Sequence, residues 1–403
     1  MKSLLTELRD PVRWQEFRDW KNEHGQLSKK EQQELERFLA EKAYLPLAET
    51  LAFSLPEKRI LSKSGSNKKR TVYCFNAAET WILKLLAWLL YRYDGELSDS
   101  CYSFRRRITA KTAFDRIRKI PDINGRTVVK LDIRNYFNSI DVPQLLEVLK
   151  EVLQDDLPLF AFLEKLLSED RCVWNGETIS EKRGAMAGVP LASFFANFYL
   201  RSLDRLFEEA DIPYFRYSDD ILIFYENEAQ MEKHNAILKK ELERKKLELN
   251  PDKQHVSLPG EAWEFLGFSW HQGEIDLSAV TVGKMKAKIR RKARRIRRSM
   301  KRKGTSFEKA AASMIRSFDY KFFDLSGTND FTWSRFYFPL LTRTDGLKEI
   351  DRCMQEYLRY LSSGRHYKGN YSVTYEQLKK LGYTPLTAEF YRWKKENEEL
   401  RGA

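Results

Sequence analysis

The chain has 403 residues, of which 42% are hydrophobic and 32% are charged, a balance that favours a folded protein of two or three lobes over a disordered one. No apolar run reaches the roughly 20 residues of a membrane-spanning helix. Glu7, Arg9 and Asp10 interrupt the stretch that a signal peptide would need to be apolar. The four cysteines and five histidines are scattered, so nothing indicates a zinc site or a disulfide framework. We therefore expect a cytoplasmic protein without a membrane partner.

The excess positive charge is confined to one segment. Lysine and arginine number 71 against 58 acidic residues, and 13 of the basic residues lie between Lys284 and Lys303, where no acidic residue occurs. The rest of the chain is neutral. A solvated basic face is the ordinary interpretation of a charge run, but thirteen like charges repel each other unless something neutralises them. The segment therefore predicts a polyanionic partner such as nucleic acid.

The first half of the chain is expected to mix helices with a few strands. Residues 1–60 have a helical pattern, with Ser28 as the N-cap of a helix that runs to Ala43. The stretch 63–69 is a polar turn, and the β-prone residues after it indicate a hairpin arm. Further elements are a helix over 77–93, a buried strand over 126–133, and helices over 142–153 and 157–167.

The second half begins with a glycine-rich stretch over 183–190. It leads into an apolar helix predicted over 191–209, two strands within 214–225 that a pair of acids separates, and an amphipathic helix over 226–247. A strand pair over 263–270, the basic helix, a loop over 326–330 and further helix complete the chain. This order of elements fits a ferredoxin-like split βαβ pattern within an α+β fold.

Two acidic features indicate metal chemistry. Asp219 and Asp220 interrupt the β-prone sequence FRYSDDILIFY, and an isolated pair of this kind is more often an exposed turn. Asp132 follows a second apolar strand and precedes the aromatic pair Tyr136-Phe137. Two Mg²⁺ ions about 4 Å apart need at least two shared carboxylates, and Asp132 with Asp219 could supply them.

These residues resemble the motifs of reverse transcriptases of the bacterial, group II intron and retron-like lineage. Asp132 with its aromatic pair matches the first catalytic motif, and 217–220 (YSDD) matches the YxDD box. The family's Gly-Pro motif resembles 188–200, its lysine motif 250–253 and its primer grip Phe265, Leu266 and Gly267, while 63–72 resembles the fingers element that contacts the triphosphate. Six elements in the expected order overturn the interpretation of the acidic pair as a simple turn.

The resemblance implies a right-hand polymerase with fingers, a ferredoxin-like palm and a helical thumb. It implies RNA-directed DNA synthesis from dNTPs with two Mg²⁺ ions, or Mn²⁺ as the alternative, held by Asp132, Asp219, Asp220 and the carbonyl of Ile133. The partners would be an RNA template and a DNA product. The expected domains are an N-terminal helical extension (1–60), fingers (61–127), a palm (128–270) that includes part of the fingers (151–187), and a basic helical thumb (278–403).

The same resemblance assigns roles around the nucleotide. Phe137 lies where the family places its steric gate against a 2′-hydroxyl, and a plain core aromatic is the competing interpretation. Arg70, with Lys69 as the near alternative, would bind the triphosphate. Further contacts with the nucleotide are expected from Gly188, Pro190 and Lys253. The cations expected to bind the nucleic-acid backbone are those of the basic segment: Arg290, Arg294, Arg297 and Arg298.

Departures from the family pattern reduce the number of reverse transcriptase lineages that the chain can resemble. Ala187 stands where the family has a Gln, and Ala192-Ser193 replaces the usual Ser-Pro. With no further maturase or endonuclease motif, the chain is most similar to the antiphage defence-associated reverse transcriptases, which would copy a structured noncoding RNA. Template-independent DNA synthesis, as in phage-exclusion relatives, and a non-catalytic nucleic-acid-binding scaffold remain the alternatives. Protein partners and oligomeric state stay open.

Overall fold

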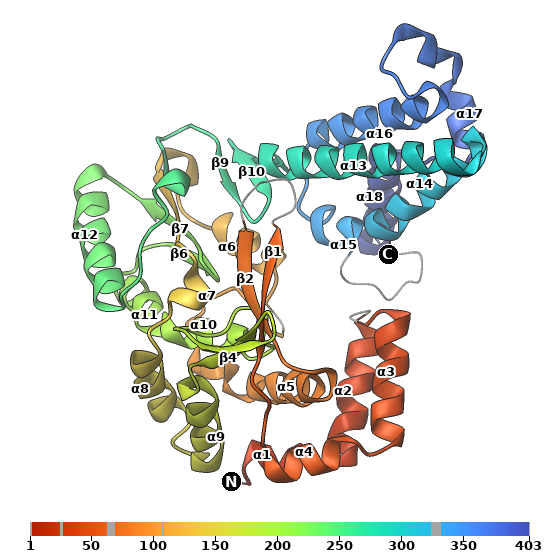
Figure 1. Ribbon diagram of the computed structural model, residues 1–403. Coiled ribbons are helices and arrows are strands. Elements are labelled where there is room, and N and C mark those ends of the chain that lie inside the picture. The colour runs from red at the N-terminus through yellow and green to blue at the C-terminus, as the bar shows by residue number, and fades with distance from the viewer. Residues whose placement is uncertain (1, 25–26, 63–68, 107, 324–331, 403) are drawn as a thin grey trace. The chain divides into compact units, whose positions relative to one another are not determined.

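The computed structural model describes residues 2–24, 27–62, 69–106, 108–323 and 332–402 (Figure 1). The chain divides into two compact units. The first holds residues 2–22, 27–62 and 69–261, and the second holds 262–402 with 23–24. Among these described residues, no helix combines the length and the apolar character that crossing a bilayer requires.

The first unit is built around an antiparallel sheet of order β6-β7-β3-β8. Its strands are Tyr214–Tyr217 (β6), Asp220–Tyr225 (β7), Thr127–Asp132 (β3) and His255–Ser257 (β8). The predicted strand pair around the acidic residues is therefore confirmed, and in the register of β3 with β7 Asp132 stands opposite Asp220. The side chains of β7 from Ile221 to Tyr225 are fully buried. The apolar runs thus form the centre of this unit and place acidic residues at the strand ends.

A second sheet of the first unit has the order β2-β1-β4-β5. Its strands are Glu57–Ser62 (β1), Lys69–Cys74 (β2), Arg171–Trp174 (β4) and Glu177–Ser180 (β5). The hairpin arm expected after residue 69 is confirmed, with Arg70 opposite Leu61. The β4–β5 hairpin was not expected, because four-residue strands are too short for a reliable alternation pattern. The predicted turn at 63–68 lies outside the described residues.

Helices surround both sheets of the first unit. Their capping residues explain several boundaries: Ser28 and Asn76 each form a reciprocal capping box, with Glu31 and Glu79 respectively. The helical elements are Leu4–Glu7 (α1), Pro11–Glu23 (α2), Lys29–Ala40 (α3), Tyr44–Thr50 (α4), Ala77–Leu89 (α5), Leu90–Glu96 (η1), Ala110–Ile117 (α6), Ile123–Gly125 (η2), Tyr136–Ser139 (α7), Val142–Val152 (α8), Leu157–Ser168 (α9), Ala192–Tyr199 (α10), Arg201–Glu209 (α11), Glu228–Arg244 (α12) and Pro251–Lys253 (η3).

Two predicted helices were wrong in extent. The single helix expected over 191–209 is interrupted at Leu200, whose ψ of 9° leaves the helical range between α10 and α11. The helix expected over 77–93 changes after Leu89 into the tighter 3₁₀ turn η1. Each segment has apolar residues at helical spacing on both sides of the break, so hydrophobic periodicity alone could not locate the breaks.

The second unit joins a small sheet to a group of helices. The sheet, of order β11-β10-β9, contains Trp263–Phe265 (β9), Phe268–His271 (β10) and Glu274–Leu277 (β11), which confirms the strand pair predicted over 263–270. The helices are Ala279–Lys303 (α13), Phe307–Phe322 (α14), Trp333–Tyr337 (α15), Asp345–Ser363 (α16), Lys368–Ser372 (η4), Tyr375–Lys380 (α17) and Leu386–Gly402 (α18). The loop predicted over 326–330 lies outside the described residues.

The basic helix α13 packs through the thin apolar seam that its sequence predicts. Met285, Ile289, Ala293 and Met300 are buried, whereas Ile296 is only half-buried. This seam contacts α14 and α16. Lysine and arginine occupy the remaining faces, so packing of the seam keeps the charges at the surface.

Candidate active site

The acidic pair lies in the tight turn between β6 and β7. Ser218 adopts a left-handed backbone conformation (φ 61°), which reverses the chain and leaves Asp219 between the two strands. The carbonyl oxygen of Asp219 accepts a hydrogen bond from the amide of Ile133 (3.1 Å), so the turn is joined to the end of β3. Asp132 and Asp219 therefore lie at the same edge of the sheet.

Burial and mutual repulsion act on these carboxyl groups. Burial, followed by the charge of Asp132, raises the pKa of Asp219 above its ordinary value. The pKa of Asp220 is also raised by burial, although Lys130, 3.9 Å away, acts in the opposite direction. The edge of the sheet thus concentrates negative charge in a poorly solvated position.

The lysine motif lies directly against the first aspartate. Lys253 forms an ion pair with Asp132, and the side-chain amide of Asn250 donates to the other oxygen of that carboxylate (3.2 Å). The backbone amide of Asn250 also donates to the Asp132 carbonyl (2.8 Å). Lys253 is therefore held beside the carboxylates as a positive charge, a position that its place in a turn did not reveal.

A cavity of about 800 Å³ in the first unit brings most of the predicted residues together. Its walls come from β2, the end of β3, α7, the β6–β7 turn and η3. The predicted residues that line it are Lys69, Arg70, Asp132, Ile133, Phe137, Asp219 and Lys253. Segments separated by more than 180 positions in sequence thus contribute to a single site.

Phe137 and Arg70 lie together on the wall of this cavity. The guanidinium carbon of Arg70 is 5.8 Å from the centre of the Phe137 ring, within the range of a cation–π contact. Phe137 is half-buried and also meets the ring of Phe104 edge-on at 6.4 Å. A ring with one face toward a cavity can contact a ligand there, which a fully buried core aromatic cannot do.

Gly188 and Pro190 lie elsewhere. They line a separate cavity of about 370 Å³, whereas the neighbouring Ala187 lines the cavity of the carboxylates. Gly188 has a φ of 100°, and an added Cβ would lie 3.0 Å from Val72 and 3.1 Å from the Tyr73 carbonyl. Close packing on β2 therefore explains this glycine.

A buried polar network beneath the turn was missed by the sequence analysis. Arg216 forms a bidentate ion pair with Asp204 at 2.6 and 2.5 Å, and neither side chain is exposed. Ser103 accepts from the amide of Ser218 (2.9 Å) and donates to Asn197 (2.8 Å). The side chain of Asn197 is thus held behind the site by two hydrogen bonds with Ser103. In the sequence, the signal for a buried partner is that a charged residue, Arg216, lies within a β-prone and mostly apolar run.

The donor set at this edge fits hard divalent cations. Carboxylate and carbonyl oxygens are the ligands that Mg²⁺ prefers, and Mg²⁺ usually keeps several waters and binds substrate phosphates besides one or two carboxylates. Among the described residues, no group of three His, Cys, Asp or Glu side chains is arranged to hold an ion. The pair Asp132 and Asp219 with the Ile133 carbonyl is consistent with ions that depend on substrate phosphate, and repulsion between the carboxylates favours a cation there.

The predicted primer-grip residues belong to the second unit. Phe265 is buried in β9, and Leu266 and Gly267 form the turn to β10 with φ values of 50° and 87°. A Cβ on Gly267 would lie 2.9 Å from both the Thr281 and the Tyr337 hydroxyl groups. The resemblance assigns this glycine to the primer grip, and packing within the second unit by itself requires a glycine here.

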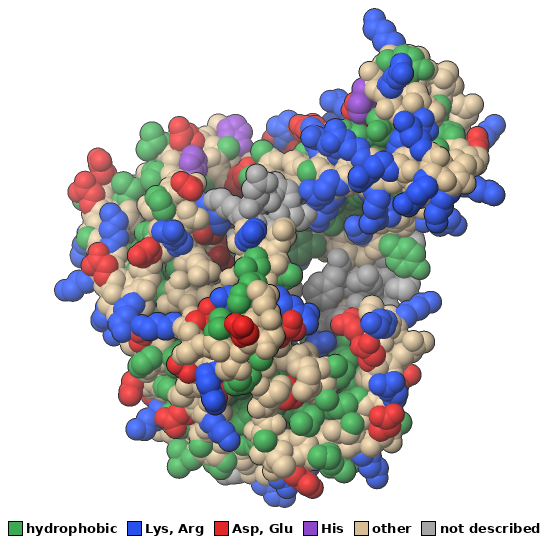
Figure 2. Space-filling model, viewed as in Figure 1, with side chains coloured by type: hydrophobic (Ala, Val, Ile, Leu, Met, Phe, Trp, Pro, Cys, Tyr) green, Lys and Arg blue, Asp and Glu red, His purple; other side chains and the backbone are tan. Residues whose placement is uncertain are grey.

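The second unit carries a basic groove, defined by a cavity of about 1,090 Å³ among α13, α14 and α16. Figure 2 shows the Lys and Arg side chains gathered over α13. Its lining includes ten cations: Lys288, Arg291, Lys292, Arg294, Arg295, Arg297, Arg298, Lys301, Lys321 and Arg365. Burial, followed by Lys321, lowers the pKa of Lys288, as expected where like charges crowd together.

The four arginines predicted to bind the nucleic-acid backbone differ in their position relative to the basic groove. Arg294, Arg297 and Arg298 line the basic groove, whereas Arg290 does not. Arg297 also donates to the carbonyl of Leu361 (2.9 Å) near the end of α16. Its removal would therefore disturb the fold as well as the charge.

Residues 61–270 match the family model described as "Reverse transcriptase (RNA-dependent DNA polymerase)". A comparison with curated proteins finds no match. Similar solved structures include a C-terminally truncated apo telomerase from Candida tropicalis (13% identity, TM-score 0.45, 56% of this chain and 55% of that one). Another is telomerase from Candida albicans with a fragment of telomeric RNA (14%, 0.46, 81% and 64%). The chain thus spans about half of the length of the first structure.

The family match begins within β1, ends within β10 and includes both sheets of the first unit. It covers just over half of the 403 residues. The α+β right-hand polymerase fold expected from the sequence is confirmed, and the chain belongs to the reverse transcriptase family of RNA-directed DNA polymerases.

Proposed function

We propose that this protein synthesises DNA from dNTPs on an RNA template with two Mg²⁺ ions. The observation that carries the proposal is the 800 Å³ cavity in which Asp132 and Asp219 face Arg70 and Phe137. Carboxylates, a phosphate-binding cation and an aromatic wall are the groups that nucleotidyl transfer from a dNTP requires. Enzymes of this family use divalent metal ions, which supply Lewis-acid activation of the primer hydroxyl and neutralise the triphosphate.

In this proposal the chain's own residues bind and orient the reactants. Asp132, Asp219 and the carbonyl of Ile133 hold the cations, and Asp220 adds negative charge behind them. Arg70 binds the triphosphate bidentately, with Lys69 beside it. Phe137 lies under the sugar and excludes a 2′-hydroxyl. The ion pair holds the Lys253 ammonium group at Asp132. When the nucleotide and the cations bind, this group would leave Asp132 and contact the phosphates.

The nucleic acid would be held mainly by the basic groove. Its cations lie on α13, on α14 and just after the end of α16, and none of the described acidic side chains lines it. Phosphate contacts of this kind are independent of sequence. We propose the fingers, palm and thumb boundaries given by the sequence, with Phe265, Leu266 and Gly267 as the primer grip. Antiphage defence with a structured noncoding RNA is the biological role that the departures at Ala187 and Ala192-Ser193 favour.

The decisive experiment is primer extension by the full-length protein on matched RNA and DNA templates. We expect dNTP incorporation that requires a divalent cation, follows the RNA sequence and is lost in Asp219→Asn. Product formation without any template would instead support the template-independent alternative. No synthesis with Mg²⁺ or Mn²⁺ on any template, by protein that still binds RNA, would favour the scaffold.

The biological role needs separate evidence. We expect sequencing of RNA copurified with the protein to find one abundant species whose complement appears in DNA made by the wild type and is absent with Asp219→Asn. Phage plaque counts on cells with either protein test the defence role. Equal plaque counts with an active and an inactive polymerase would contradict it.

A further inference from the structure

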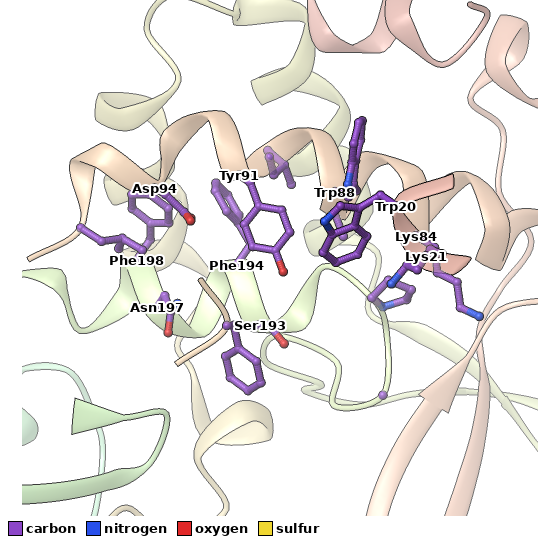
Figure 3. A pocket seen from close by; sticks show the side chains of 16 residues that line it. Trp20, Lys21, Lys84, Trp88, Tyr91, Asp94, Ser193, Phe194, Asn197 and Phe198 are labelled. Atoms are coloured by element: carbon purple, nitrogen blue, oxygen red, sulfur yellow. The ribbon is translucent and has the colours of Figure 1, made fainter. Parts of the chain in front are cut away.

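The cavity on the other side of the Gly188–Pro190 loop has a defined composition. This aromatic cavity, of about 370 Å³, is lined by Trp20 of α2, Trp88 of α5 and Tyr91 of η1, together with Phe194 of α10. Figure 3 shows these rings in the middle of the cavity, between two groups of polar side chains. All of its lining residues belong to the first unit.

One end of the aromatic cavity is cationic. Lys21 and Lys84 both line it, and Figure 3 shows them together at one end. Burial, followed by the charge of Lys84, lowers the pKa of Lys21 to about 8. An acidic neighbour, Glu31, lies 3.5 Å from Lys84. Glu31 compensates one of the two ammonium charges, so the lysine pair keeps a net positive charge that favours a further anionic group at this end of the cavity.

The opposite end offers hydrogen-bonding groups. Asp94 and Asn197 lie there, away from the lysines (Figure 3). Both amide atoms of Asn197 are already used by Ser103. The carboxylate of Asp94 already accepts from the backbone amide of Arg106. Because a carboxylate has about four acceptor sites, it can also accept from the amino and imino edge of a base such as guanine.

Trp88 contributes a ring and a neighbouring cation to the cavity. Among the residues that the structure describes, its indole Nε1 is one of the few buried side-chain atoms without a hydrogen-bond partner. The guanidinium of Arg106 lies over the rings of Trp88 (4.4 Å) and Tyr91 (5.0 Å), which adds positive charge beside the cavity. The ring of Trp88 lines the cavity, so it can stack on a base there without using its indole N–H.

We propose that the aromatic cavity binds one unpaired nucleotide, with its base among Trp20, Trp88 and Tyr91 and its phosphate at Lys21 and Lys84. A volume of about 370 Å³ lies at the lower end of the range of small-molecule pockets, which is roughly 300–1,000 Å³ and suits one nucleotide better than a duplex. Aromatic side chains with nearby cations are the usual means of holding unpaired bases. Asp94 confers preference for a base with an amino group over uracil.

The nucleotide could come from the RNA strand or from solution. The loop from Ala187 to Pro190 has the carboxylate cavity on one side and the aromatic cavity on the other, so a strand near the first site could place an unpaired base in the second. This inference goes beyond the polymerase reaction, because binding in the aromatic cavity requires neither metal ions nor dNTPs.

The test is calorimetric titration of the full-length protein in EDTA, which removes metal-dependent binding at the carboxylates. The probes are GMP, UMP and a single-stranded RNA of eight nucleotides. We expect GMP to bind more tightly than UMP, and Trp88→Leu to weaken binding by about 5- to 150-fold, the value of stacking one base. Trp88→Phe should retain most of the affinity because it keeps a ring, and Asp94→Asn should bring GMP and UMP closer together.

Matched controls separate the site from general effects. Trp174→Leu removes a tryptophan that belongs to β4 and not to this cavity, and it should change nothing. Lys21→Met with Lys84→Met should weaken both probes and reduce the salt slope for the RNA by about 0.7, because the pair neutralises one phosphate. Lys30→Met, at a highly exposed lysine, is the control for that pair. Thermal melting of each variant verifies the fold.

The outcomes also identify the source of the nucleotide. Loss of RNA affinity together with GMP affinity in Trp88→Leu indicates an unpaired nucleotide of the strand, and loss of GMP affinity alone indicates a free nucleotide. Equal affinities of the wild type, Trp88→Leu and the double lysine variant for every probe would overturn the inference. A protein that binds GMP in EDTA but synthesises no DNA would refute the proposed polymerase and leave this site intact.

Discussion

Arg216 and Asp204 form a fully buried bidentate ion pair directly behind the turn that presents Asp219. The Arg216 Nε and Nη2 atoms lie 2.6 and 2.5 Å from the two Asp204 oxygens. Arg216 also donates to the carbonyls of Asn197 (3.2 Å) and Ser218 (3.4 Å). One side chain thus connects α11, α10 and the acidic turn, which makes it a positioning residue for the carboxylates.

The pair yields a stability prediction. Asp204→Asn leaves the Arg216 charge buried without compensation, and we expect it to lower the free energy of unfolding by about 3–5 kcal/mol. Urea denaturation measures this change. Asp115→Asn, which breaks the exposed pair with Lys111, should cost about 0.5 kcal/mol or less.

The double variant Arg216→Met with Asp204→Leu tests the reason for the loss. It removes both charges together, so it should recover much of the stability lost in Asp204→Asn. We expect its DNA synthesis to stay low, because the link to the Ser218 carbonyl is gone. Full activity in this variant would show that the pair does not position the acidic turn.

The carboxylates at the turn should matter for chemistry and not for folding. We expect Asp219→Ala with Asp220→Ala to abolish divalent-cation-dependent dNTP incorporation, a loss of about 10³-fold or more if the cations contribute several kcal/mol. Because burial raises the pKa of both groups, their removal should not lower the melting temperature in EDTA. Primer extension and thermal melting measure the two effects. Wild-type extension by the double variant would eliminate the two-metal assignment.

Phe137 is expected to select the sugar. Phe137→Ala should raise incorporation of rNTPs relative to dNTPs, since the ring that lines the carboxylate cavity no longer meets the 2′-hydroxyl. Single-nucleotide incorporation with each substrate gives the ratio, and Phe137→Tyr, which keeps the ring, is the control. If the ratio stays constant in an active Phe137→Ala enzyme, the ring is only part of the core.

The basic groove should dominate the salt dependence of nucleic-acid binding. Changing Arg294, Arg295, Arg298 and Lys301 to Gln should flatten the slope of log affinity against log salt on duplex DNA by up to about 3.6, and weaken binding to many sequences alike. Arg297 is retained because it also donates to Leu361. Affinity measured from low to high salt, on a cognate RNA and an unrelated duplex, provides the data.

The matched control for the groove removes the same charge elsewhere in the second unit. Lys379, Arg392, Lys394 and Lys395 each have a carboxylate partner within 4 Å, and changing them to Gln should leave the slope nearly unchanged. Catalysis at saturating template should survive in both variants. A large loss confined to the cognate RNA, with an unchanged slope, would favour recognition of RNA shape over simple electrostatics.

The sequence by itself determined the family and much of the local structure. The order of Asp132, the YSDD turn and the lysine motif resembles that of reverse transcriptases, and the family match confirms this family. Apolar, β-prone runs predicted β3, β6 and β7, and Ser28 predicted the start of α3. The concentration of charge in 284–303 predicted the basic face of α13. Each of these signals is local, so the chain carries it before folding.

Only the tertiary structure decided which residues meet. Lys253 pairs with Asp132 from 121 positions away, and Ser103 reaches the Ser218 amide from 115 positions away. The assignment of Ala187 to one cavity and Gly188 to another depends on how a single loop packs against β2. The break at Leu200 and the aromatic cavity likewise arise from contacts among several elements. Local periodicity contains no information about such contacts, because burial and charge pairing between distant segments determine them.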